Sequence, residues 1–204
     1  AREAGVPIER KTGEAIDALA EGSSHGGVLA LVGERRTVEL ADLLPADRPA
    51  FVVMLDGIED PFNFGQAVRS LYACGVDGLV LRPRNWLSTA ATVARSSAGA
   101  SELIPTAIAE SAEEAATFFQ SKGLTIACAA EEESVPINRA DLTQPLFLLI
   151  GGEKRGITRS FLRQADLRLE IPYGREFRQS LGVTAAAAIL GYEVMRQRGR
   201  RDEG

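Results

Sequence analysis

Three segments of the chain carry residues whose types and spacing could do chemistry: residues 60–69, 151–156 and 171–184. Each comes after an apolar stretch. The first places Arg69 one turn into a predicted helix, and the amino terminus of a helix favours phosphate. The second surrounds Glu153 with glycines, so that backbone groups and a carboxylate could meet a ligand together. The third runs through two arginines into an alanine-rich helix.

The first segment, residues 60–69 (DPFNFGQAVR), predicts a helix from Asn63 to Cys74 with Asn63 as its N-cap. Its apolar face consists of Phe64, Ala67, Val68, Leu71 and Tyr72. Gly65 and Arg69 lie on the opposite face, where the missing side chain of Gly65 would let a ligand come close. Taken alone, this pattern favours an ordinary capped amphipathic helix with a solvated arginine.

The second segment, residues 151–156 (GGEKRG), follows a predicted strand that ends at Ile150. Its glycines predict backbone donors and acceptors that face a ligand. It is not a P-loop, because no Gly-Lys-Ser/Thr closes it, and it lacks the G-x-G-x-x-G spacing of a dinucleotide site. The alternative is a tight turn with charged tips. Glu153 weakens that alternative slightly. A loop that binds phosphate would avoid a carboxylate, whereas a site for a hydroxyl or an amine could use one.

The third segment leads from Ile171 into a predicted helix that begins at its N-cap Ser180 and ends at Gln197. One apolar stripe along this helix consists of Leu181, Ala185, Ala188, Tyr192 and Met195, and a second of Val183, Ala187, Leu190 and Val194. A helix that is apolar on two sides packs against two surfaces. The second surface is a partner subunit or the core of the same chain, and the pattern leaves both open.

The elements that position these segments alternate from residue 51 onward. Short apolar stretches predict strands at 51–55, 78–81, 124–128, 146–150 and 167–171, and helical patterns lie at 63–74, 111–121, 160–165 and 180–197. This alternation indicates an α/β fold with a parallel sheet covered by helices on both faces. Ligands bind such sheets at the carboxyl ends of the strands.

Residues 1–44 are predicted to form a separate unit. They contain a polar helical stretch at 12–20 and an apolar strand at 28–32, which is too little to bury a core. We therefore expect the end of a larger N-terminal domain, a linker at 45–50 and a second domain at 51–204.

Composition and charge narrow the class of protein. Hydrophobic residues make up 45% and charged residues 25%, which is typical of a soluble globular protein, and no apolar run is long enough to span a membrane. The net charge of −5 argues mildly against nucleic-acid binding, because RNA binding depends on basic surface. Basic residues nevertheless cluster at Lys154/Arg155 and Arg175/Arg178, and a local basic patch is enough to bind RNA.

The two cysteines, Cys74 and Cys128, lie in apolar surroundings without metal-ligand spacing. They predict buried, reduced thiols in a cytoplasmic protein that binds no metal.

Taken in order, the three segments resemble the motifs of the SpoU/TrmH family within the SPOUT methyltransferases. The residues that match the family's first motif are Asn63, Gly65 and Arg69, and those that match its Gly-x-Glu-x-x-Gly motif are Gly151, Glu153 and Gly156. The third motif, Ile-Pro followed by Ser-Leu-Asn-Val-Ser, is matched by Ile171, Pro172, Ser180, Leu181 and Val183. Residues 94–100 are similar to the family's Ser-Ala-Gly-Ala stretch, and the resemblance covers about residues 50–198.

This resemblance implies a methyltransferase that uses S-adenosyl-L-methionine (SAM) to modify a ribose 2′-hydroxyl of structured RNA, with ribosomal RNA favoured over transfer RNA. It implies a C-terminal trefoil knot, against the general rule that chains do not thread loops, and a homodimer. It also implies that residues 1–44 are the end of an RNA-binding domain like ribosomal protein L30.

The resemblance also implies roles for individual residues. The catalytic residues are Asn63, Arg69, Glu153 and Ser180. The cofactor-binding residues are Gly151, Gly152, Ile171, Ser180 and Leu181. The RNA-binding residues are Arg69, Lys154, Arg155, Arg175 and Arg178.

One departure from the family motif matters, because Gly182 stands where the family has Asn. A catalytically impaired SPOUT-fold protein that binds RNA or assists ribosome assembly is therefore the main alternative. A nicotinamide-dependent oxidoreductase is a third hypothesis, but it would need a dinucleotide fingerprint that the chain lacks.

Overall fold

The computed structural model describes residues 5–20, 25–33, 35–83, 89–130, 133–152 and 156–199. The chain divides into two compact units, residues 1–35 and residues 36–204. Apart from helix α1 (Gly13–Asp17), every described helix and strand lies in the second unit.

In the first unit, α1 is capped by the Thr12 hydroxyl, which accepts a hydrogen bond from the Ala15 N–H at 3.3 Å. His25 holds the segment after it: its Nδ1 accepts from the Gly27 N–H at 3.0 Å, and its Nε2 lies 2.6 Å from an Asp17 carboxylate oxygen. The strand predicted at 28–32 is wrong. These residues are exposed and irregular, since the described part of the chain offers them no neighbouring strand.

The second unit is built on a seven-stranded sheet with strand order β3-β2-β1-β6-β4-β7-β5, and all its strand pairs are parallel. The strands are β1 (Phe51–Asp56), β2 (Gly78–Leu81), β3 (Thr106–Ile108), β4 (Thr125–Ala129), β5 (Val135–Pro136), β6 (Leu146–Gly151) and β7 (Leu167–Glu170). The central pair runs in register from Phe51 opposite Leu146 to Asp56 opposite Gly151. The carboxyl ends of β1 and β6 therefore lie side by side.

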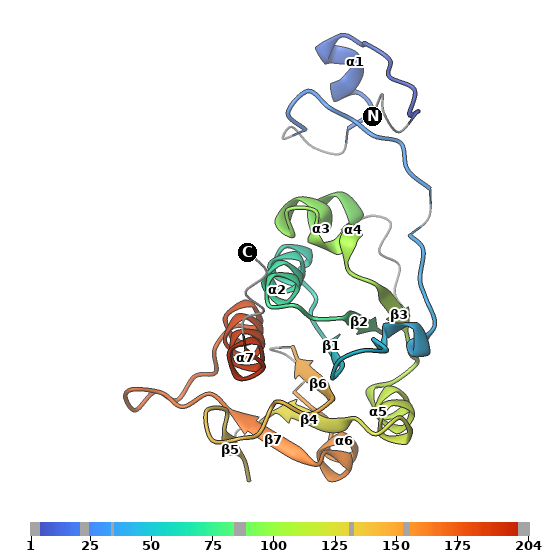
Figure 1. The fold of residues 1–204 in the computed structure, drawn as a ribbon. Coiled ribbons are helices and arrows are strands. Elements are labelled where there is room, and N and C mark those ends of the chain that lie inside the picture. Colours follow the sequence, from blue (N-terminus) through green and yellow to red (C-terminus); the bar gives the residue numbers. More distant parts are fainter. Residues whose placement is uncertain are drawn as a thin grey trace. The chain divides into compact units, whose positions relative to one another are not determined.

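Helices cover both faces of this sheet (Figure 1). One face carries α2 (Pro61–Ala73), α3 (Ala90–Ser96), α4 (Ala100–Leu103) and α7 (Val183–Gln197), and the other carries α5 (Ala112–Ser121) and α6 (Arg159–Gln164). A hydrophobic core lies on each face of the sheet, and successive side chains of β1 enter one core or the other. Val53 packs with α2 and α7, and Val52 packs with α5. The predicted parallel α/β sheet with helices on both faces is confirmed.

The N-terminus of α2 differs from the prediction. The Asp60 carboxylate caps the helix by accepting the N–H groups of Phe62 at 2.7 Å and Asn63 at 3.0 Å. Pro61 is the first helical residue, a position where its missing N–H costs nothing. The prediction that Asn63 is the N-cap is therefore wrong, because Asn63 already lies in the first turn.

Gly65 serves helix packing. A Cβ at this position would lie 1.9 Å from the Ser96 hydroxyl oxygen and 2.8 Å from the Val93 carbonyl oxygen. The predicted room for a ligand is thus filled by α3. Ser96 is itself buried and donates its hydroxyl to the Thr92 carbonyl at 2.8 Å.

The second unit begins earlier along the chain than the linker expected at 45–50. Val38 forms a parallel bridge with Ala107 of β3, and the 3₁₀ helix η1 (Leu40–Leu43) packs beside β2 and β3. Leu43 is buried against Gly78, where a Cβ would lie 2.5 Å from a Leu43 methyl carbon. Residues 36–44 thus belong to the unit that contains the sheet.

The predicted stripe of α7 that contains Val183, Ala187, Leu190 and Val194 is buried, and it packs with α2. On the other stripe, Tyr192 remains 56% exposed. Helix α7 begins at Val183 with Gly182 in the N-cap position, so the prediction that Ser180 caps it is wrong. The backbone before Gly182 is still an irregular loop, which delays the helix.

The end of α7 is held by Arg198. Its guanidinium donates hydrogen bonds to four carbonyl oxygens, those of Leu142 at 3.1 Å, Pro49 at 2.8 Å, Ala50 at 3.1 Å and Gln144 at 2.6 Å. These carbonyls precede β1 and β6, so a single side chain joins the end of the helix to the start of the two central strands.

Gly65→Ala is expected to lower the free energy of unfolding by about 1 to 3 kcal/mol, because the new methyl group overpacks the contact between α2 and α3. This loss should exceed the gain in helix propensity. Urea denaturation of the variant, beside Gln66→Ala on the same helix, measures the effect. If Gly65→Ala were as stable as Gln66→Ala, the close contact would not constrain the fold.

Candidate functional site

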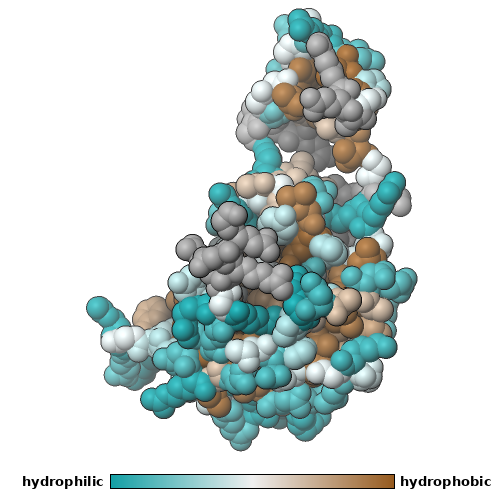
Figure 2. Space-filling model, viewed as in Figure 1, coloured by the Kyte–Doolittle hydropathy of each residue, from teal (hydrophilic) through white to brown (hydrophobic). Residues whose placement is uncertain are grey.

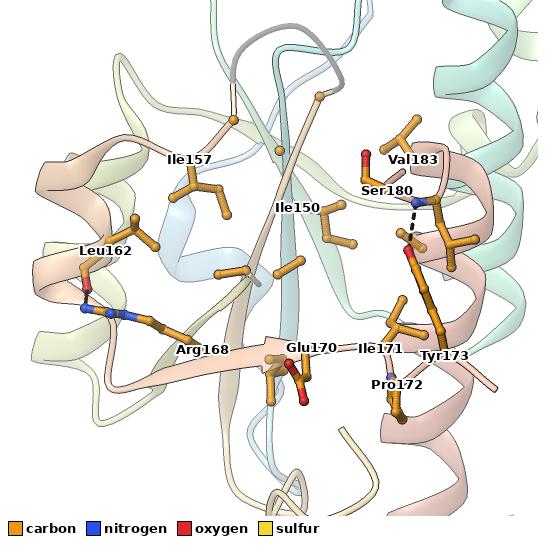
Figure 3. Close-up of a pocket in the computed structure, with 18 of the residues that line it drawn as sticks. Ile150, Ile157, Leu162, Arg168, Glu170, Ile171, Pro172, Tyr173, Ser180 and Val183 are labelled. Carbon is orange, nitrogen blue, oxygen red and sulfur yellow. Dashed lines mark hydrogen bonds between the residues drawn. The ribbon is translucent and has the colours of Figure 1, made fainter. Parts of the chain in front are cut away.

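A pocket of about 840 Å³ lies at the carboxyl ends of β4, β6 and β7. Ala129, Gly151 and Glu170, the last residues of these strands, all line it (Figure 3). Parallel strands end at one edge of the sheet, so this position is the one expected for a ligand site.

Polar and apolar groups share the wall of the pocket almost equally, and few of the lining side chains are charged. The apolar lining residues include Ile150, Ile157, Leu162, Leu169, Ile171 and Val183. The charged lining residues are Arg168, Glu170 and Arg178. The Arg168 guanidinium pairs with Glu133 and donates to the Leu162 carbonyl at 2.8 Å. One Glu170 carboxylate oxygen accepts the Ser134 hydroxyl at 2.8 Å.

The loop between β7 and α7 is fastened by Tyr173. The Tyr173 hydroxyl accepts the Leu181 N–H at 3.1 Å, drawn as a dashed line in Figure 3, and it donates to the Gln179 carbonyl at 3.3 Å. These bonds place Ser180 and Leu181 against the pocket.

Gly152 is needed for a close approach between two loops. Its N–H donates to the Asp56 carbonyl at 2.7 Å. A Cβ at Gly152 would lie 2.1 Å from the Gly57 carbonyl oxygen, a contact that no side chain could occupy. The glycine therefore brings the loop after β6 against the loop after β1.

A smaller pocket of about 170 Å³ shares Gly152 and Val183 with the first. Asn63 lines it, and the Asn63 carbonyl accepts the Thr184 hydroxyl at 3.3 Å. This bond joins the first and third segments of the sequence analysis. Thr184 makes the contact, whereas Gly182 has no side chain with which to do so.

The structure brings together the five residues predicted to bind cofactor. Gly151, Gly152, Ile171, Ser180 and Leu181 all line the larger pocket. Of the predicted RNA-binding residues, Arg178 lines it as well, and Arg175 is exposed nearby in the sequence. Glu153, Lys154 and Arg155 lie outside the described residues.

Arg69 is exposed on α2 and lines neither described pocket. Among the described residues it has no hydrogen-bond or ion-pair partner. Because Arg69 is exposed, a ligand that approaches α2 from solvent could reach its guanidinium.

A polar cluster that the sequence analysis missed holds the segment after the glycine loop. The Glu113 carboxylate on α5 accepts the hydroxyls of Thr158, at 2.6 Å, and Ser160. Thr158 is also the N-cap of α6, since its hydroxyl oxygen accepts the Phe161 N–H at 3.2 Å. Hydrogen bonds from Ser160 and Thr158 hold the pKa of Glu113 below its ordinary value. No local pattern around Glu113 signals this distant contact.

Other kinds of site find less support. Burial raises the pKa of the Cys128 thiol to about 11, so at neutral pH this cysteine is protonated and a poor nucleophile. The described residues contain no group of three or more His, Cys, Asp or Glu side chains that could hold a metal ion. None of the described helices is both long enough and apolar enough to cross a membrane.

The geometry of the pocket agrees with a comparison of the whole sequence. The pattern of the SpoU rRNA Methylase family matches residues 50–192, which is most of the chain. This chain belongs to that family. The resemblance drawn from the three segments is confirmed.

Curated relatives and a solved structure extend this result. The chain is 30% identical over 95% of its length to the 23S rRNA (guanosine-2′-O-)-methyltransferase RlmB of Shewanella oneidensis, covering 80% of that protein. It is 31% identical over 97% of its length to RlmB of Xylella fastidiosa, covering 81% of it. The SpoU methyltransferase AviRb of Streptomyces viridochromogenes, solved with AdoMet, matches with a TM-score of 0.71 and 26% identity over 81% of this chain. This chain spans 66% of the AviRb chain.

Glu113→Gln is expected to lower the free energy of unfolding at neutral pH by roughly 1 kcal/mol, because hydrogen bonds to a charged acceptor become bonds to a neutral one. The pKa of the wild-type carboxyl is lowered in the folded state, so its contribution is present above the ordinary carboxyl range. This contribution is lost as the pH falls through the lowered pKa. The free energies of unfolding of the variant and the wild type should then become equal. Denaturation from pH 7 down to about pH 2.5, below the lowered pKa, measures this. The exposed Glu110→Gln variant is the control, and a difference independent of pH would contradict the assignment.

Proposed function

We propose that this protein transfers a methyl group from S-adenosyl-L-methionine to a ribose 2′-hydroxyl of RNA. The observation that carries the proposal is the pocket at the carboxyl edge of the sheet, which collects all five predicted cofactor residues in a chain of the SpoU family. The AdoMet complex of the structurally similar AviRb supports the choice of cofactor.

The residues of the pocket fit this cofactor. The volume of about 840 Å³ lies in the range of small-molecule sites, and the apolar part of the wall suits an adenine ring. Gly151, Ile171 and Leu181 would offer backbone groups to it, and Glu170 is a carboxylate for a ligand that carries positive charge. When bound, the cofactor supplies a methyl group on a positively charged sulfur.

The protein must hold the 2′-oxygen in line and assist the loss of its proton. A guanidinium is in general a poor base, so Arg69 is better suited to an electrostatic clamp on the adjacent phosphate and on the developing alkoxide. The proton acceptor is then a phosphate oxygen or Glu153. Asn63 and Ser180 complete the proposed catalytic set, and the bond between Thr184 and Asn63 supports a common position for the two segments.

Ribosomal RNA is the favoured substrate. The relatives in Shewanella and Xylella are both named 23S rRNA methyltransferases that act on a guanosine 2′-oxygen. The predicted RNA contacts at Arg69, Lys154, Arg155, Arg175 and Arg178 would supply positive charge on a chain whose net charge is −5.

The proposal extends to architecture. The family implies a trefoil knot formed by the segment up to α7, a cytoplasmic location, and an L30-like origin for the N-terminal residues, now limited to the first unit, residues 1–35. A homodimer with the active site near the interface is supported by the face of α7 that the sheet leaves uncovered. On this face Ile189 is 37% exposed and Tyr192 is 56% exposed.

Isothermal titration is expected to show that SAM binds and that NAD does not. Labelled methyl groups should then pass from SAM into ribosomal RNA isolated from a strain that lacks this protein. Binding of NAD without binding of SAM would overturn the proposal. Binding of SAM without transfer to any RNA would instead identify the catalytically impaired alternative.

Arg69→Ala is expected to reduce methyl transfer by about 100- to 1000-fold and to leave SAM affinity nearly unchanged, because Arg69 is exposed and lies outside the pocket. Arg69→Lys should be nearly as damaging, since an ammonium cannot make the bidentate contact of a guanidinium. Turnover and a SAM titration of each variant measure the two effects. Near-normal turnover in Arg69→Ala would exclude the catalytic role, and loss of SAM binding would place Arg69 in the cofactor site.

Tyr192→Asp is expected to convert a dimer into a monomer, because a carboxylate in an apolar interface leaves an unpaired buried charge. Light scattering should give twice the chain mass of 21.8 kDa for the wild type and the single mass for the variant. Gln120→Asp, on the exposed side of α5, is the control and should stay dimeric. A monomeric wild type at micromolar concentration would refute the dimer.

A further inference from the structure

We propose that Tyr173 and Phe177 form a stacking platform for a base of the RNA substrate at the mouth of the cofactor pocket. The inference rests on the proposed function and adds to it a specific site for the nucleotide. No motif of the sequence analysis assigned either aromatic residue.

The two rings lie at the larger pocket and are open to solvent. Both residues line the pocket, together with Arg178 and Ser180. Their ring centroids are 6.1 Å apart at an angle of 52°. Phe177 is nonetheless 56% exposed and Tyr173 39% exposed, so the rings border the pocket without being buried in it.

One ring is held in place by the backbone. The Tyr173 hydroxyl bonds to the Leu181 N–H and the Gln179 carbonyl, and these bonds fix its ring against the end of the loop. Pro172 restricts the backbone just before it. The platform is therefore partly preorganised, which reduces the entropy lost when a base stacks on it.

The charges around the rings favour a nucleic acid over a protein partner. Arg175 and Arg178 flank Phe177, and the only nearby acid in residues 173–180 is Glu176. The contact between Arg178 and Glu176 is 3.8 Å long and almost fully exposed, so it holds the guanidinium weakly. Aromatic rings between cationic side chains are the arrangement with which proteins bind unpaired bases and the phosphates beside them.

The surface of this loop is consistent with such a site. It projects from the second unit between β7 and α7 (Figure 1), and the space-filling view shows hydrophilic groups beside less polar ones along it (Figure 2). A base that stacks there would bring its own ribose, or that of its neighbour, to the pocket that holds the methyl donor. The platform would thus position a nucleotide for methyl transfer, without selecting among the four bases.

Three variants of Phe177 separate stacking from simple apolar contact. Phe177→Ala should weaken binding of a fluorescein-labelled single-stranded oligoribonucleotide by about 5- to 100-fold, the usual effect of losing one stacked base. Phe177→Leu keeps an apolar side chain without a π face and should lose nearly as much. Phe177→Tyr should bind like the wild type. An oligonucleotide with the same backbone but without bases should bind all four proteins equally weakly.

Two further measurements identify other roles for Phe177. A rise in the Kd for SAM in Phe177→Ala would make the ring a wall of the cofactor site, and a change in mass by light scattering would make it a contact between subunits. A rise in the Kd for SAM, a change in mass, or normal RNA binding by Phe177→Leu would each overturn the proposal of a stacking platform. Because these are binding measurements, they stand apart from methyl transfer: a wild type that binds the oligonucleotide through Phe177 and transfers no methyl group refutes the proposed activity alone.

Discussion

The position of α7 is the constraint on which both pockets depend. Val183, in its first turn, lines the two pockets, and the Thr184 hydroxyl ties this turn to α2 through the Asn63 carbonyl. At the other end, the Arg198 guanidinium donates to four carbonyls that precede β1 and β6. Hydrogen bonds to a charged donor are stronger than neutral ones, so this one side chain sets the helix along the central strands. Displacement of α7 would open the larger pocket and break the contact with α2.

Backbone groups and charged side chains occupy different parts of the site. Glycines and loop backbone form much of the pocket, because only a residue without a Cβ fits where Gly152 meets Gly57. Charged side chains at the rim of the pocket or outside it, such as Arg178 and Arg69, remain accessible to a polyanion. If the pocket holds the cofactor and these arginines contact RNA, as proposed, the two kinds of binding could vary independently of each other.

Much of the fold could be predicted, because continuous apolar stretches such as 51–55 and 146–150 are typical of strands that are buried on both faces of a parallel sheet. Short elements were missed: α3 and α4 are rich in Ser and Ala, and the position of α3 depends on its contact with Gly65. The two wrong N-caps, Asn63 and Ser180, show that several residues could cap each helix. Asp60 before Pro61 was the better signal. Within the site, motif residues could be located, but the contacts of Glu113 and Tyr173 depend on tertiary structure.

The exposed loop between β7 and α7 has a consequence for the continuity of the chain. Arg175 and Arg178 are both exposed there, and trypsin cleaves the peptide bond that follows an exposed arginine. A cut after either arginine would break the covalent link between α7 and the rest of the chain. The helix would nevertheless stay in place through its packing on α2 and through the hydrogen bonds of Arg198. The nicked protein would keep its native size and fall into two pieces only in denaturant. Its fold depends on where α7 is bound, and much less on the peptide link that leads to it.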